Sequence, residues 1–318
     1  IQQMDKNITN SNVKYEQIVQ ISFGAKFWSS LIMLFRSNKF QTNVLKLGAW
    51  YSTTFKPTYH FLPKSQKVEF IQLETGARME LLTEKAGPTK SVLLMLHGGA
   101  YMLGLTNTYR TIAQRYKKQL QIDVASLDYR FGPQHTWPAA LDDAFECYQK
   151  LQNIYSQILV VGDSAGGNLA TTLCIKLAHQ NIQLPSKLVL LSPYGDLSHK
   201  NATFSTNSLV DPLLGFSSKE KMLNCEYLGT ANPLEPLVSP IFAQAADFAG
   251  FPETLVQVGT CEVLEADSDL LVEKMREAGV KVRLHKFCGM FHCFQVIFYG
   301  LKESQEAWAE IWGFLRGE

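Results

Sequence analysis

The sequence has almost no excess of charge of either sign and no long apolar run. Its 318 residues include 30 Lys and Arg against 29 Asp and Glu, which leaves a net charge of +1. A surface that binds polyanions needs a strong positive excess, so no nucleic-acid partner is expected. No uninterrupted apolar stretch approaches the ~18 residues that a membrane-spanning helix requires. The sequence also lacks internal repeats and low-complexity tracts.

The cysteines lack any regular spacing. None of the six cysteines shows C-x-x-C spacing or the Cys/His spacing of a metal site, and several lie in apolar periodic segments. We therefore expect reduced core residues and no metal site among these cysteines. Reduced cysteines favour a reducing compartment such as the cytoplasm. The six are Cys147, Cys174, Cys225, Cys261, Cys288 and Cys293.

Short apolar runs alternate with stretches of helical periodicity through most of the chain. This alternation predicts an α/β fold, with a mostly parallel central sheet and helices on both faces. The first two strands are expected to form a hairpin around residues 74–77. The expected strands cover residues 68–73, 78–83, 91–96, 124–127, 158–161, 187–191, 254–258 and 282–287, and the main helices cover 108–120, 138–155, 266–278 and 302–315.

The N-terminal part follows a different pattern. Residues 13–35 carry apolar side chains at helical spacing, and a second helical stretch covers residues 41–51. Two interpretations stay open for these helices. One is a mobile cap over a pocket that makes weak contact with a membrane surface, and the other is an ordinary packed helix pair.

A second irregular segment lies between residues 194 and 237. It is rich in Ser, Thr, Asn and Pro around one expected helix at residues 219–227, and it interrupts the strand–helix alternation. We interpret it as an insertion at the carboxyl edge of the sheet, where such folds bind ligands. The chain is thus expected to be a single domain over 1–318, with a core of about 61–194 and 237–318 and a cap of about 1–60 and 195–236.

Residues 157–170 combine a short buried strand, a serine flanked by glycines and the start of a helix. Ser164 lies between Gly162 and Gly166 in the pattern G-x-S-x-G. In this pattern a strained turn lifts the serine hydroxyl clear of the sheet, and glycines avoid steric crowding beside it. The following helix N-terminus favours developing negative charge. Ser164 is therefore the predicted nucleophile.

A glycine-containing loop at residues 97–101 directly follows an expected strand. Consecutive small residues let backbone N–H groups converge on one oxygen, as a tetrahedral intermediate requires. Such a loop acts together with the N–H that follows the nucleophile. This predicts an oxyanion hole from Gly98, Gly99 and Ala165, whereas the alternative is a plain glycine turn.

The catalytic base is expected to be a histidine late in the chain, because this arrangement orders its triad as Ser, acid, His. Four histidines follow Ser164: His179, His199, His285 and His292. His292 occupies a loop straight after the last expected strand, from which an imidazole can reach the serine. His285 lies within that strand and is interpreted as structural.

The acid is expected just past the strand at residues 254–258, where three carboxylates follow. Glu262 is nearest the strand end and best suits orienting the imidazole. Asp267 begins a helix and is interpreted first as a cap or dipole partner. Glu265 runs into the same helix. Glu262 is favoured, and the other two carboxylates stay open as alternatives.

Two further motifs connect these features to a known family. Residues 128–133 read DYRFGP and residues 137–144 read WPAALDDA. From about residue 92 to 294 the chain resembles the hormone-sensitive-lipase-like branch of the α/β-hydrolases, a group of esterases and deacetylases. The resemblance implies a helical cap over a pocket for the acyl and alcohol groups. It also implies that Gly99, Ala100 and Ala165 donate to the oxyanion, with Asp163 and the region of Arg130 structural.

Two positions depart from the family pattern. Ala100 stands where a third glycine is usual, which keeps the N–H but narrows the backbone's options. The acid is commonly Asp in the sequence D-P-L, whereas this chain reads Glu262-Val263-Leu264. One sub-branch of the family shows Glu at this position.

The sequence therefore predicts a serine carboxylesterase with the triad Ser164, Glu262 and His292, acting on a small-molecule ester of short to medium acyl length. This chemistry needs no metal and no cofactor. Tyr101 is expected to line the substrate pocket. An amide or aryl deacetylase on the same machinery is one alternative. A non-catalytic small-molecule receptor is another, although the related receptors lack the triad histidine. Analogy with the family also suggests a homodimer.

Overall fold

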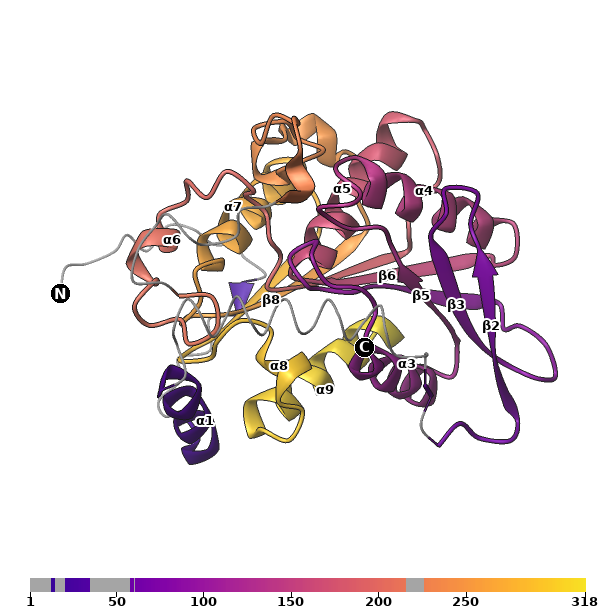
Figure 1. The fold of residues 1–318 in the computed structure, drawn as a ribbon, viewed down its shortest axis with the longest axis horizontal. Helices are drawn as coiled ribbons and strands as arrows, with labels where there is room; N and C mark the ends of the chain where they lie inside the picture. The colour runs from indigo at the N-terminus through magenta and orange to yellow at the C-terminus, as the bar shows by residue number, and fades with distance from the viewer. Residues whose placement is uncertain (1–12, 15–20, 35–57, 60, 216–225) are drawn as a thin grey trace.

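The computed structural model describes residues 13–14, 21–34, 58–59, 61–215 and 226–318. Its centre is a nine-stranded sheet with the order β1-β9-β8-β7-β6-β4-β5-β3-β2 (Figure 1). The strands are β1 (Val13–Lys14), β2 (Gln66–Gln72), β3 (Arg78–Glu84), β4 (Ser91–Leu96), β5 (Asp123–Asp128), β6 (Gln157–Asp163), β7 (Lys187–Leu191), β8 (Glu253–Gly259) and β9 (Val282–Phe287).

The sheet is parallel except at one edge. Neighbouring strands from β1 through β5 in the sheet order pair in parallel, while β3 pairs antiparallel with β5 and with β2. The expected hairpin is confirmed, and its turn is closed by a 2.9 Å hydrogen bond from the N–H of Leu73 to the carbonyl of Ala77. The carboxyl ends of the parallel strands consequently share one edge of the sheet.

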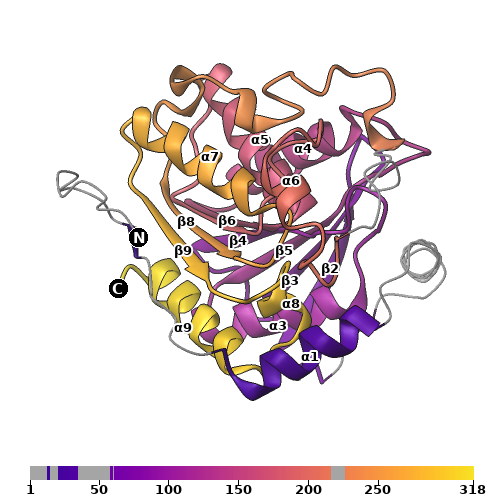
Figure 2. The ribbon, with the colours of Figure 1, turned by 90° about the vertical axis from the view of Figure 1, so that its left-hand side faces the viewer.

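Helices cover both faces of the sheet, as the alternating pattern predicts (Figure 2). In β4 this produces a continuous apolar run, because Leu94 faces one core cluster while Leu93 and Met95 face the other. The helices on one face are α4 (Ala139–Gln152), α5 (Ala165–His179) and α7 (Glu265–Glu277), and those on the other are α3 (Asn107–Leu120), α8 (Phe294–Ile297) and α9 (Lys302–Arg316).

The N-terminal prediction is wrong in its first part. Val13–Lys14 forms the short strand β1, which pairs with β9, and helix α1 covers Phe23–Leu34. The start of α1 is set by Ser22, whose hydroxyl oxygen accepts the N–H of Ala25 at 3.1 Å. The same serine donates through its N–H and its hydroxyl to Glu303 of α9. The expected helix at residues 41–51 lies outside the described residues.

Little regular structure occurs in the described part of the segment between β7 and β8. It contains the one-turn helix α6 (Thr203–Thr206) and three 3₁₀ turns, η2 (Glu226–Leu228), η3 (Pro240–Phe242) and η4 (Ala245–Phe248). The expected helix at residues 219–227 lies mostly outside the described residues. The lapse in strand–helix alternation is nevertheless present where the composition predicted it.

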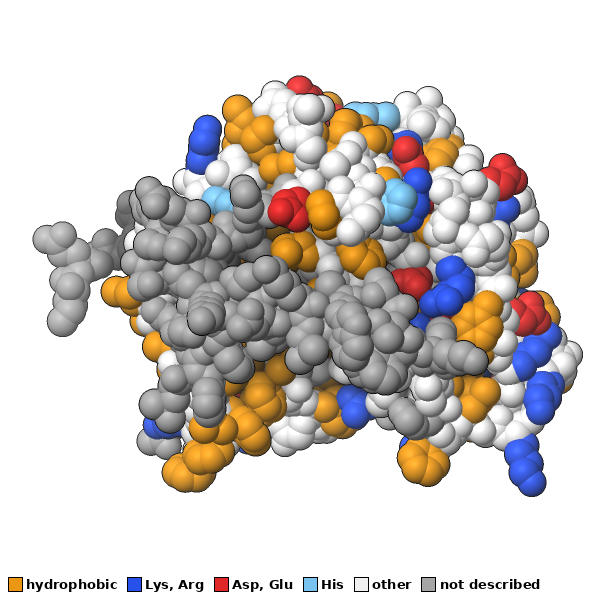
Figure 3. Space-filling view, in the orientation of Figure 1, with side chains coloured by type: hydrophobic (Ala, Val, Ile, Leu, Met, Phe, Trp, Pro, Cys, Tyr) orange, Lys and Arg blue, Asp and Glu red, His pale blue; other side chains and the backbone are white. Residues whose placement is uncertain are grey.

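One region of the described surface is apolar. Hydrophobic side chains gather where α1 lies in Figure 1 (Figure 3), and the large exposed ones of this helix are Phe23, Phe27, Trp28 and Met33. No helix in the described part of the chain is both long enough and apolar enough to cross a membrane.

Candidate active site

Ser164 lies at the turn between β6 and α5, in a backbone conformation that L-residues rarely adopt. Its φ is 54° and its ψ is −119°. A Cβ on Gly162 would lie 2.1 Å from the carbonyl oxygen of Gly166, and a Cβ on Gly166 would lie 2.0 Å from that of Leu96. The backbone packs so closely here that neither flanking position admits a side chain. The elbow therefore depends on both glycines.

A continuous chain of hydrogen bonds runs from this serine through a histidine to a glutamate. Ser164 Oγ is 2.9 Å from His292 Nε2, and His292 Nδ1 is 2.8 Å from Glu262 Oε2. All three side chains are buried, and that of Glu262 is fully inaccessible. They follow the carboxyl ends of β6, β9 and β8, so the parallel part of the sheet brings residues that are distant in sequence to one edge.

Glu262 is held on its other carboxylate oxygen as well. Its Oε1 accepts the N–H of Gly259 at 2.6 Å and the hydroxyl of Ser192 at 2.8 Å. The hydroxyl oxygen of Ser192 in turn accepts the N–H of Cys293 at 3.2 Å. Sequence reasoning missed Ser192. Its position directly after the buried strand β7 was the one available signal.

The other two carboxylates of this region have different partners. Asp267 is buried, and its Oδ2 accepts the N–H groups of Gly195 and Asp196 at 2.8 and 3.0 Å. Glu265 pairs with Lys286 at 2.9 Å. Of the three carboxylates considered from the sequence, Glu262 alone is hydrogen-bonded to His292.

The remaining histidines after Ser164 are also engaged away from the serine. The imidazole of His179 lies 2.7 Å from Asp247, and that of His285 lies 2.8 Å from Glu310. His199 is hydrogen-bonded to the hydroxyl of Tyr194. Among the four histidines that were candidates, His292 is the one in contact with Ser164.

The surroundings of His292 favour its protonated form. Burial by itself lowers its pKa, but contacts with Cys293 and with the carboxylate of Glu262 outweigh this and raise the pKa well above the ordinary value of 6.5. Burial raises the pKa of the Cys293 thiol to about 11, although the neighbouring His292 acts in the opposite direction. Glu262, hydrogen-bonded to His292 Nδ1, is placed to stabilise the imidazolium.

The loop after β4 presents backbone N–H groups near the elbow. Gly99, Ala100 and Tyr101 all have positive φ angles, of 125°, 54° and 57°. Within the described residues, the N–H groups of Gly99, Ala100 and Ala165 make no hydrogen bond. Unsatisfied donors of this kind are what an oxyanion hole requires.

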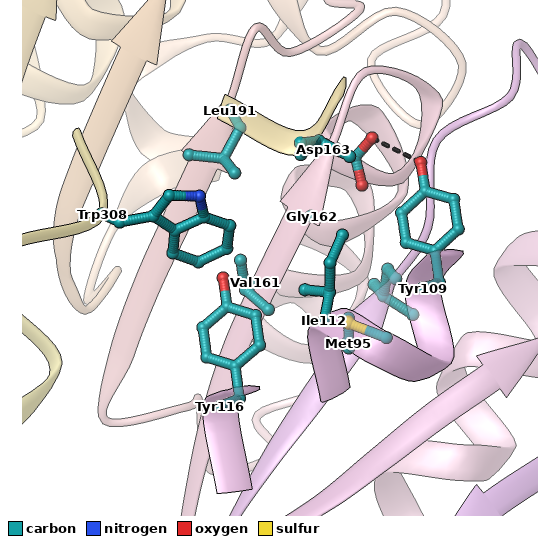
Figure 4. A pocket seen from close by; sticks show the side chains of 11 residues that line it. Met95, Tyr109, Ile112, Tyr116, Val161, Gly162, Asp163, Leu191 and Trp308 are labelled. Atoms are coloured by element: carbon teal, nitrogen blue, oxygen red, sulfur yellow. Dashed lines mark hydrogen bonds between the residues drawn. The ribbon is translucent and has the colours of Figure 1, made fainter. Parts of the chain in front are cut away.

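Gly98 does not fit the expectation that its N–H is such a donor. This N–H points at Tyr109 Oη at 2.9 Å and at Asp163 Oδ1 at 3.1 Å. Tyr109 also donates its hydroxyl to Asp163 Oδ2 at 2.7 Å (Figure 4). The bonds tie the loop to the residue before Ser164, and no free donor remains on Gly98.

Asp163 borders a small cavity on the α3 and α9 side of the sheet (Figure 4). The lining is mainly apolar and includes Tyr116 and Trp308, but neither Ser164 nor His292. Burial raises the pKa of Asp163 to about 6, although Tyr109 and Gly98 donate hydrogen bonds to it. This side of Asp163 is a packed support for the elbow and not a place where substrate meets Ser164.

Tyr101 also departs from its expected place in a substrate pocket. Its side chain is 1% exposed, and its ring stacks on that of Tyr227 with the centroids 4.2 Å apart. Its hydroxyl donates to Asn168 Oδ1 at 2.7 Å. These contacts make the side chain of Tyr101 part of the protein interior.

Arg130 has the structural setting that the family resemblance implies. Its guanidinium pairs with Asp143 at 2.7 Å, and the backbone N–H of Arg130 donates to the same carboxylate at 2.8 Å. Elsewhere in the described part of the chain, no three His, Cys, Asp or Glu side chains lie together in a way that could hold a metal ion. The five described cysteines are unpaired.

Comparison with known proteins places these features in context. Residues 93–296 match a family described as having the alpha/beta hydrolase fold. The chain is 36% identical to an esterase of Acinetobacter venetianus, over 74% of this chain and 78% of the relative. It is 32% identical to an acetyl-hydrolase of Streptomyces hygroscopicus, over 70% and 75% of the two chains. A crystal structure of an esterase from the bacterial hormone-sensitive lipase family superposes with a TM-score of 0.76 and 29% identity, and the match covers 94% of this chain and 99% of that one.

Proposed function

Because this chain belongs to the hormone-sensitive-lipase-like α/β-hydrolases and is a carboxylic ester hydrolase, we propose that Ser164, His292 and Glu262 form its catalytic triad. The proposed substrates are small-molecule esters with short to medium acyl chains. The observation that carries the proposal is the unbroken hydrogen-bond chain from Ser164 Oγ through the imidazole to Glu262.

The first half of the reaction forms an acyl-enzyme. His292 Nε2 accepts the proton of Ser164 Oγ as this oxygen attacks the ester carbonyl. Glu262 holds the Nδ1–H tautomer and stabilises the imidazolium that forms. The imidazolium then gives its proton to the alkoxide leaving group, and the alcohol departs.

The second half releases the acid. A water molecule loses its proton to His292 Nε2 and attacks the acyl carbonyl, after which the proton returns to Ser164 Oγ. In both halves, negative charge develops on the carbonyl oxygen. The N–H groups of Gly99, Ala100 and Ala165 are the proposed donors to this oxygen, and a missing donor of this type typically costs about 10²–10³-fold in kcat.

We assign the insertion at about 195–236 to a cap, together with about 1–60. Two contacts support the part of this assignment that falls on described residues. Asn207 donates its side-chain amide to the carbonyl of Glu262 at 3.0 Å, and Asp211 accepts the N–H of Val263 at 2.9 Å. The insertion therefore packs directly on the loop that carries the proposed acid.

The acyl length and the kind of bond cleaved are the finer parts of the proposal. Similarity to an acetyl-hydrolase favours short acyl groups. A deacetylase that cleaves amides would use the same residues, so matched aryl esters and anilides are the substrates that separate the two. Retention of His292 in contact with Ser164 argues against a receptor that only binds. Membrane-surface contact and a homodimer stay predictions.

Hydrolysis of p-nitrophenyl acetate, butyrate, octanoate and palmitate by wild type and Ser164→Ala tests the proposal. We expect the highest kcat/KM at acetate or butyrate, and a loss of about 10⁴-fold or more in Ser164→Ala. Full activity in Ser164→Ala would refute the assignment of the nucleophile. A folded wild type that binds a ligand tightly but hydrolyses none of these esters would instead support a receptor.

A further inference from the structure

Asn168, in the first turns of α5, joins three segments of the chain through one buried amide. Its Oδ1 accepts the hydroxyl of Tyr101 at 2.7 Å. Its Nδ2 donates to the carbonyl oxygens of Tyr194 and Val238, both at 2.9 Å. The side chain is only 2% exposed, so water does not compete for these bonds.

The three partners of Asn168 lie at particular points of the fold. Tyr101 directly follows Ala100 in the proposed oxyanion loop. Tyr194 and Val238 flank the insertion at about 195–236, one just before it and one just after it. A single side chain of α5, the helix that follows Ser164, is thus hydrogen-bonded to the oxyanion loop and to both ends of the insertion.

Tyr101 also contacts the insertion itself. Its ring stacks on Tyr227 at an interplanar angle of 10°, and its carbonyl accepts the N–H of Gly132 at 2.9 Å. The φ angle of 57° is unfavourable for a bulky side chain. Such a conformation persists only where the surroundings hold it firmly. The stacked ring and the buried hydroxyl are contacts that do so here.

We propose that Tyr101 and Asn168 are positioning residues that hold the N–H groups of Gly99 and Ala100 in the geometry of the oxyanion hole and join this loop to the insertion. This inference rests on the proposed function. Neither side chain touches the reacting atoms. Their effect on the reaction passes through the backbone of the loop, where a displacement of about 1 Å can cost roughly 10²-fold in rate.

Tyr101→Phe is the most direct test, because it removes the hydroxyl and keeps the ring. We expect kcat on p-nitrophenyl butyrate to fall about 10-fold with KM nearly unchanged, since the loss appears mainly in the transition state. Affinity for a trifluoromethyl ketone, which forms an oxyanion on Ser164, should fall by the same factor as kcat/KM. A purely structural role would not couple these two quantities.

Tyr148→Phe is the matched control. Tyr148 is as buried as Tyr101, and its hydroxyl donates to the carbonyl of Gln183 at 3.0 Å, away from the oxyanion loop. The Tyr148→Phe variant should lose about as much thermal stability as Tyr101→Phe but keep its kcat and its inhibitor affinity.

Asn168→Ala removes all three hydrogen bonds of the Asn168 side chain and should lower kcat more than Tyr101→Phe. The double variant should be no worse than Asn168→Ala, because the shared bond is already lost.

Two outcomes separate a failure of this inference from a failure of the proposed function. If Ser164→Ala is inactive while Tyr101→Phe keeps wild-type kcat and inhibitor affinity, the positioning role is refuted and the triad stands. If Ser164→Ala retains full activity, the proposed function fails and the positioning role fails with it. Tyr101→Phe decides the matter even if Asn168→Ala does not fold.

Discussion

The hydroxyl of Ser192 donates a 2.8 Å hydrogen bond to Glu262 Oε1, the carboxylate oxygen that does not face His292. The same hydroxyl oxygen accepts the N–H of Cys293, the residue that follows His292. Ser192 therefore links the proposed acid to the loop of the proposed base. A buried carboxylate held on both oxygens keeps one orientation, and so does the imidazole bonded to it.

Replacing Ser192 by Ala should lower kcat by about 10-fold, equivalent to ~1.4 kcal/mol in activation free energy. The physical reason is that Glu262 loses a hydrogen bond and the N–H of Cys293 loses its acceptor. Steady-state kinetics on p-nitrophenyl butyrate measure this. Ser186→Ala is the control. Ser186 precedes the first residue of β7, and its hydroxyl donates to the carbonyl of Ile158, so its loss should leave kcat unchanged. Equal losses in both variants would contradict the role of Ser192.

Glu262→Gln should mainly reduce activity, whereas Asp267→Asn should mainly reduce stability. Glu262→Gln should lower kcat by roughly 10³–10⁴-fold, because the imidazole loses its orienting negative charge. Asp267→Asn should keep kcat within a few-fold but lower the free energy of unfolding by about 1–3 kcal/mol, because an amide cannot accept from all of the donors that face this side chain. Kinetics combined with denaturant unfolding separate the two. A large kcat loss confined to Asp267→Asn would reassign the acid.

The pH dependence of kcat/KM should report the raised pKa of His292. The proposed base would act as the neutral imidazole, so kcat/KM should rise with pH through this pKa and fall about 10-fold for each pH unit below it. The inflection is expected above 6.5. Glu262→Gln removes the charge that favours the imidazolium, so its inflection should move to lower pH. An inflection that does not move would indicate that a different group titrates.

A side chain at the elbow should be far more costly than one at an open glycine. The Cβ of Gly166→Ala would collide with the carbonyl of Leu96, whereas a Cβ on Gly300 meets nothing within 4 Å. We expect Gly166→Ala to lose most of its soluble yield and its activity. Gly300→Ala should keep its activity, with a melting temperature close to that of wild type. A folded, fully active Gly166→Ala would show that the elbow can relax.

The central sheet was largely predictable because its signals are local. Buried parallel strands show as uninterrupted apolar runs, and β4, β7 and β9 have the predicted bounds. The N-terminal error has a physical cause of the opposite kind. Val13 and Lys14 form a strand through pairing with β9, a contact with residues about 270 positions away that local periodicity does not encode.

The site residues show the same difference between local and long-range signals. Motif and position were enough to single out Ser164 and His292 from the sequence, and their catalytic roles stay predictions until the variants are measured. The occupied N–H of Gly98 and the inward-facing ring of Tyr101 were not foreseeable, because both follow from Tyr109, Asp163 and Asn168 folding against one loop.

By itself, the sequence determined the α/β architecture, the elbow and the order of the candidate residues, since apolar periodicity and glycine spacing act over a few neighbouring positions. Position after a strand favoured Glu262 but left Glu265 and Asp267 open, and the tertiary structure decided which carboxylate faces the imidazole. Glu262 and Asp267 lie five residues apart on one short segment and are both fully buried. One is turned toward His292 by Gly259 and Ser192, and the other accepts backbone N–H groups at the start of the insertion. That choice depends on hydrogen bonds between chain segments far apart in sequence, and these exist only once the sheet has formed.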